Sequence, residues 1–169
     1  VVGILLIMRQ PSQNPGEVAQ PKLGGTYSEG LIGSFQRLNP LFDFYNQPDR
    51  DVDRLIFNGL IKYDSEGNPQ PDLAQAWGYS KDGLTYNIAL RDNVKWQDGN
   101  AFNADDVIFT IEKMRDPDSI TPLDIKAFWQ EIKVNRLNEY NLQFILPEPF
   151  APFMDYLTFG ILPQHLLSG

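Results

Sequence analysis

The sequence predicts a mixed α+β fold in which most strands are antiparallel. Alternating apolar runs and helix-like runs follow one another without the regular strand–helix repeat of a doubly wound sheet. The chain has 169 residues, of which 42% are hydrophobic and 12% aromatic, and this is enough to form a core. The expected elements are a meander from about 63 to 97, a hairpin at 131–146, and helices near 50–61, 104–116 and 150–158.

The first 22 residues divide into an apolar run and a polar linker. Residues 1–8 are apolar, but they are fewer than the roughly 20 that span a bilayer. They are either the end of a cleaved leader or membrane anchor, or a buried strand. Residues 9–22 contain three prolines among polar residues, which is typical of a flexible spacer. An apolar segment before a spacer favours a leader or anchor and hence an exported protein.

Alternating acids open the helix expected at 50–61. Asp49, Asp51 and Asp53 have the spacing of a calcium loop, but Arg54 stands where such a loop requires glycine. These acids are therefore assigned to the first turn of a helix. The residues predicted to share the helix's apolar face are Val52, Leu55, Ile56 and Gly59.

A β-hairpin is indicated between residues 77 and 91. Residues 84–91 alternate apolar and polar side chains, the period of a half-buried strand. Asp82 and Gly83 form a tight-turn pair just before it. Trp77 and Tyr79 are expected to lie on the partner strand.

Strong start signals precede the helix expected at 104–116. A short strand at 94–97 is predicted to end at a second Asp-Gly pair. Asn103 is a favourable N-cap, and Asp106 occupies the capping-box position. The apolar stripe of this helix consists of Val107, Ile108, Ile111 and Met114. Beyond Pro117 we expect a loop that leads into a short segment containing Phe128 and Trp129.

The residue types for most catalytic and cofactor sites are missing. The chain has no cysteine and one histidine, His165, so no metal site, cofactor or catalytic residue is predicted. Asp105 and Asp106 are neighbours on a helix and diverge by about 100°, so they do not flank one bond as glycosidase carboxylates do. The net charge of −8 without a basic run makes nucleic acid an unsuitable partner.

The order LA..W..S.DG.TY...LR..V.W.DG..F.A.DV.F, from residue 73 to 109, resembles the family 5 extracellular solute-binding proteins. These are the peptide-, nickel- and oligosaccharide-binding components of ABC importers. The segments GGTYSEG, FNGLIKYD and GILPQHLL also fit, so the resemblance covers about residues 23 to 167. Family members are usually much longer than this chain.

The resemblance implies part of a two-lobed fold like the type II periplasmic binding proteins. Residues 1–22 would be the leader or anchor remnant and linker, 23–45 the first segment of the large lobe, 46–160 an inserted domain, and 161–169 the return towards the large lobe. The chain would then be an N-terminal fragment of an exported binding protein for oligopeptides or dipeptides. Its partners would be a peptide or other small solute and a membrane permease, at the periplasm or the outer face of the cytoplasmic membrane.

The same resemblance points to residues near the ligand. They are Ser34, Phe35, Gln36, Thr158 and Phe159, although Phe159 fits burial in the core equally well. The large-lobe strand expected at 25–33 lacks its sheet neighbours in this chain. We therefore expect it to be poorly ordered or to pair with a second copy, because an unpaired edge strand favours association.

Two other functions remain open on the sequence alone. The chain could be a sensory or interaction module that is not coupled to a permease, which a signalling domain encoded beside it would indicate. It could also be a hydrolase that depends on its single histidine, in which case His165→Ala would abolish activity.

Overall fold

The computed structural model describes residues 24–26 and 28–168. The expected leader or anchor at 1–8 and the linker at 9–22 lie outside them. The described part of 25–33 contains no strand, so the strand predicted there is not formed. An isolated strand lacks the neighbours that satisfy its backbone groups. Its pairing with a second copy stays a prediction. Residues 31–168 belong to one compact unit, which contains all the helices and strands of the described residues.

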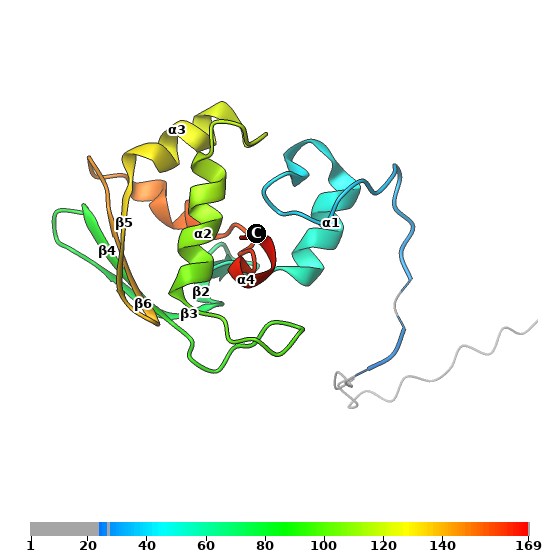
Figure 1. The fold of residues 1–169 in the computed structure, drawn as a ribbon, viewed down its shortest axis with the longest axis horizontal. Helices are drawn as coiled ribbons and strands as arrows, with labels where there is room; N and C mark the ends of the chain where they lie inside the picture. Colours follow the sequence, from blue (N-terminus) through cyan, green and yellow to red (C-terminus); the bar gives the residue numbers. More distant parts are fainter. Residues whose placement is uncertain (1–23, 27, 169) are drawn as a thin grey trace, which may run out of the picture. The chain divides into compact units, whose positions relative to one another are not determined.

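The main sheet has four antiparallel strands in the order β3-β4-β6-β5 (Figure 1). Trp77 lies opposite Ile88 and Tyr79 opposite Tyr86, which confirms the predicted hairpin. Gly83 has a φ of 72° in its turn, a conformation that glycine adopts without steric cost. The strands are β3 (Ala74–Tyr79), β4 (Thr85–Leu90), β5 (Lys133–Asn138) and β6 (Asn141–Ile145).

The first part of the expected meander forms a separate sheet. Strand β1 (Ile61–Tyr63) pairs with β2 (Pro69–Pro71) and with neither strand of the next hairpin. The strand predicted at 94–97 is reduced to a single bridge between Lys95 and Ala101. The meander is thus divided between two sheets.

Helix α2 (Ala104–Arg115) matches the expected helix and lies against the main sheet. The Asn103 backbone N–H donates to the Asp106 carboxylate at 3.0 Å, and the Asn103 side chain caps the first turn. Val107, Ile111 and Met114 are buried as predicted, and Ile108 is half-buried. They share the core with the inner face of the main sheet, which contributes Ile88, Leu142 and Phe144.

Three helix expectations need correction. Helix α1 is Gln47–Ile56, not 50–61, and the segment expected to be helical at 150–158 is a 3-10 helix, η2 (Ala151–Leu157), with a proline in its first turn. Helix α3 (Leu123–Glu131) was expected only as a short segment after a loop. It begins after Pro122 with no side-chain cap, so the sequence carries no strong start signal. Two further short elements are η1 (Asp43–Tyr45) and α4 (Gln164–Leu167).

The predicted apolar face of α1 is wrong. Leu55 is 86% exposed, whereas Asp49 and Asp53 are each only 1% exposed. The helix stops at Ile56, and the chain then runs extended past Gly59, where a Cβ atom would lie 2.7 Å from the Thr158 carbonyl oxygen. The segment after α1 therefore packs closely against the backbone of residue 158.

Candidate ligand-binding site

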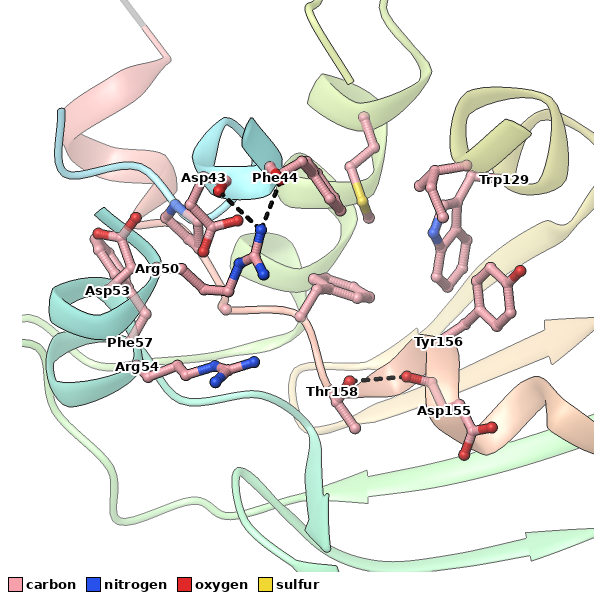
Figure 2. A pocket seen from close by; sticks show the side chains of 15 residues that line it. Asp43, Phe44, Arg50, Asp53, Arg54, Phe57, Trp129, Asp155, Tyr156 and Thr158 are labelled. Atoms are coloured by element: carbon pink, nitrogen blue, oxygen red, sulfur yellow. Dashed lines mark hydrogen bonds between the residues drawn. The ribbon is translucent and has the colours of Figure 1, made fainter. Parts of the chain in front are cut away.

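A cavity of about 380 Å³ lies between α1 with its preceding turn η1 and the segments of α3 and η2 (Figure 2). Its walls differ in character. Charged side chains of η1 and α1 line one side, and aromatic side chains of α3 and the 155–160 segment line the other. A volume of this size is at the lower end of the range for small-molecule sites.

Two arginines on the α1 wall have different surroundings. The Arg50 guanidinium donates to the carbonyl oxygens of Phe44 at 2.6 Å and Asp43 at 3.4 Å, so it holds the η1 turn in place. Arg54 lies one helical turn later and is exposed. Its positive charge acts on Asp43, where it opposes the rise in pKa caused by burial, but among the described residues it forms no hydrogen bond or close ion pair. Figure 2 shows its guanidinium extending across the cavity towards Thr158.

Acidic groups also border the cavity. Both Asp53 carboxylate oxygens are shielded from solvent and lack a close hydrogen-bond partner among the described residues. Burial, assisted by the nearby charge of Asp43, raises the pKa of Asp53 to about 6, although the nearby Asn39 backbone N–H acts to lower it. Burial also raises the pKa of Asp43. Asp155 accepts a hydrogen bond from the Tyr63 hydroxyl, and this bond raises the pKa of Tyr63 to about 12.

The aromatic wall is continuous with the core. Trp129 is buried, and its ring meets that of Phe159 edge-on at 5.5 Å between centroids. Tyr156 packs on Phe128 with ring centroids 3.9 Å apart. Side chains packed in this way keep their positions, so the wall is a preformed apolar surface.

The structure separates the five residues expected near the ligand into two groups. Thr158 and Phe159 line the cavity, and the Thr158 hydroxyl donates to the Asp155 carbonyl oxygen at 2.8 Å. Ser34, Phe35 and Gln36 are not among the residues that line it. They lie beside the start of α1 instead, and their proximity to a ligand stays a prediction.

Sequence reasoning missed Arg54 as a site residue. The available signal was its spacing from Arg50, because residues four apart lie on one face of a helix. In the sequence, Asp49, Asp51 and Asp53 have the spacing of a calcium loop, and Arg54 stood out only as the residue that breaks this motif. In the described part of the chain, no group of three His, Asp or Glu side chains could hold a metal ion.

The fold is of the type II periplasmic binding-protein class. NikZ from Campylobacter jejuni, solved in complex with Ni(L-His), is 40% identical with a TM-score of 0.71, covering 81% of this chain and 27% of that one. The oligopeptide-binding protein AppA from Bacillus subtilis, solved with a nonapeptide, is 26% identical with a TM-score of 0.72, covering 82% and 28%.

Sequence comparison identifies the family. Residues 68–165 match the family described as bacterial extracellular solute-binding proteins, family 5 Middle, and the chain belongs to this family. The periplasmic oligopeptide-binding protein OppA of Salmonella typhimurium is 36% identical over 127 residues, which is 66% of this chain and 23% of that protein. The chain thus spans about a quarter of the length of these relatives. Within the described residues, no helix has the length and apolar character needed to cross a bilayer.

Proposed function

We propose that this chain is the N-terminal part of an exported substrate-binding component of an ABC importer that takes up peptides. The family match supports solute binding, and the cavity between a charged helix and an aromatic wall supports a ligand with both polar and apolar parts. Two of the relatives described above are an oligopeptide-binding protein and a protein solved with a nonapeptide, which favours peptides over other solutes.

In this proposal, residues 23–45 and 161–169 belong to the large lobe, and 46–160 form the domain inserted into it. A second lobe outside this chain would close over the ligand. The closed protein would then deliver its peptide to a permease at the outer face of the cytoplasmic membrane. Ser34, Phe35 and Gln36 are proposed to border the cleft, since Gln36 is held next to α1 by the carboxylate of Asp49.

Calorimetric titration of the full-length protein with peptides of two to five residues tests this function. We expect saturable binding to the full-length protein and much weaker binding to the 169-residue chain, since half of the clamp is then missing. An α-galactoside and a Ni²⁺–histidine complex serve as competing cargo classes. Tight binding of either, with no peptide bound, would reject peptide import.

A further inference from the structure

We propose that Arg54 anchors a ligand carboxylate in the cavity, while the apolar part of that ligand lies on the wall formed by Trp129, Tyr156 and Phe159. This inference deepens the proposed function, on which it rests for the presence of a solute. The ligand would be an amino-acid-derived or similar organic acid with an apolar body.

The charged groups that line the cavity differ in whether a ligand can reach them. Arg50 is occupied by the carbonyl oxygens of Asp43 and Phe44. The carboxylate oxygens of Asp53 are shielded from solvent, so a ligand in the cavity does not reach them. Asp155 already accepts from the Tyr63 hydroxyl. Asp43 feels the charge of Arg54, but Arg54 makes no hydrogen bond to a described residue, so its N–H donors remain available to a ligand in the cavity.

The chemistry of Arg54 selects the ligand group. A guanidinium remains charged at all physiological pH values and offers parallel N–H donors that match the two oxygens of a carboxylate. Figure 2 shows this group pointing towards Thr158. An anion in the cavity can therefore meet a positive charge and a pair of donors on the lining.

The opposite wall defines the rest of the ligand. Trp129 and Phe159 line the cavity, and their mutual packing, with ring centroids 5.5 Å apart, fixes their positions. Tyr156 extends the same surface. Such a wall favours a group with an apolar or aromatic surface over a hydrated metal ion. The cavity of about 380 Å³ accommodates one amino-acid-sized unit, whether free or as one residue of a longer ligand.

The test uses the full-length protein and two probes that differ only in charge, 3-phenylpropionate and 3-phenylpropionamide. We expect the wild type to prefer the carboxylate, and Arg54→Gln to weaken its binding by roughly tenfold to hundredfold, the effect of losing charge-assisted hydrogen bonds. Arg54→Lys should retain part of the preference. Lys81→Gln removes the same charge from an exposed turn away from the cavity and should change nothing.

The outcomes separate this inference from the proposed function. Peptide binding that Arg54→Gln leaves unchanged, together with equal binding of both probes, overturns the anchor and leaves peptide import standing. Arg54-dependent binding of 3-phenylpropionate by a protein that binds no peptide supports the anchor and rejects peptide import. Absence of binding for both peptides and probes overturns both.

Discussion

Asp49 joins two segments that lie apart in the sequence. Its carboxylate accepts from the backbone N–H groups of Gln36 at 2.7 Å and Arg37 at 3.3 Å. Burial opposes the ionisation of Asp49, but these hydrogen bonds and one from the Asn46 side chain outweigh burial and lower its pKa. The carboxylate thereby attaches the 34–37 segment to the start of α1.

Replacing Asp49 with alanine should release this segment. Without the acceptor, the amides of Gln36 and Arg37 lose their partner, and we expect their hydrogen exchange to accelerate towards that of an open loop. Exchange measured by NMR checks this. Asp51→Ala is the matched control, because Asp51 accepts only from the Gln47 side chain on the same helix. Equal protection of Gln36 and Arg37 in all three proteins would contradict the role assigned to Asp49.

Asp53 should make stability fall as the pH rises. Its pKa is about 6 in the folded protein against 3.8 as the ordinary value, so between these pH values the folded state binds more protons than the unfolded state. The free energy of unfolding therefore decreases as the pH rises from about 4 through 6. Asp53→Asn should raise it by roughly 1–3 kcal/mol at pH 8, since a buried unpaired charge is removed.

Urea denaturation of both proteins at several pH values from 4 to 8 measures this effect. The gain from Asp53→Asn should shrink as the pH approaches 4, where the wild-type carboxyl is already protonated. A constant difference across the range would show that the pKa of Asp53 is not raised by folding, and a loss of stability at pH 8 would show that the ionised carboxylate is stabilised by its surroundings.

At the scale of elements, α2 depends on its N-terminal cap. Asn103→Ala removes the side-chain acceptor for the Asp105 N–H, which lies at 2.8 Å, and should cost about 1 kcal/mol of stability. Asn103→Asp keeps an acceptor and should retain most of it. Urea denaturation at neutral pH compares the two variants. Equal losses in both would indicate that packing of the Asn103 side chain, not capping, is responsible.

Elements with strong local signals could be predicted, and those that depend on distant contacts could not. The β3–β4 hairpin and α2 carry a turn pair, alternation and a capping box, all of which agree. Helix α3 has no capping side chain. The inward face of α1 depends on Asp49 contacting residues 36 and 37, which no helical period reveals.

The same division applies to the candidate site. The family resemblance pointed to Thr158 and Phe159, and both line the cavity, while their contact with a ligand stays a prediction. Arg54 could not be assigned to the cavity until the orientation of α1 was known. Its charge and its spacing from Arg50 are visible in the sequence, but the direction of its side chain is not.

At the scale of the whole described unit, residues 157–161 run beside residues 58–60 and hydrogen-bond to them. The Leu60 N–H donates to the Leu157 carbonyl oxygen at 3.0 Å, and the Ile161 N–H donates to the Asn58 carbonyl oxygen at 3.0 Å. A Cβ atom on Gly160 would lie 2.8 Å from carbon atoms of Phe57 and Pro40. Phe57 and Pro40 therefore lie too close to Gly160 to leave room for a side chain at this position.

Gly160→Ala should therefore destabilise the unit by roughly 1–3 kcal/mol, as overpacking does in other cores. Thermal unfolding followed by circular dichroism measures the loss. Gly78→Ala is the matched control, since nothing lies within 4 Å of a Cβ atom there and its φ is not positive. This control should leave stability unchanged or slightly raised, because the unfolded chain loses freedom. Equal effects of the two substitutions would mean that the segments can separate without cost.

The exposed leucine of α1 indicates what the rest of a longer protein should cover. Leu55 is 86% exposed, and this chain spans only 23% of the Salmonella typhimurium relative. If residues of a longer protein pack on α1, Leu55→Asp should lower the stability of that protein by roughly 1.5–3 kcal/mol through lost burial. The same substitution in the 169-residue chain should stay within about 0.5 kcal/mol, as at other exposed positions. Urea denaturation of both lengths gives the comparison. A small effect at both lengths would place the outer face of α1 in solvent in the longer protein, whose other residues would then have to contact this unit through other surfaces.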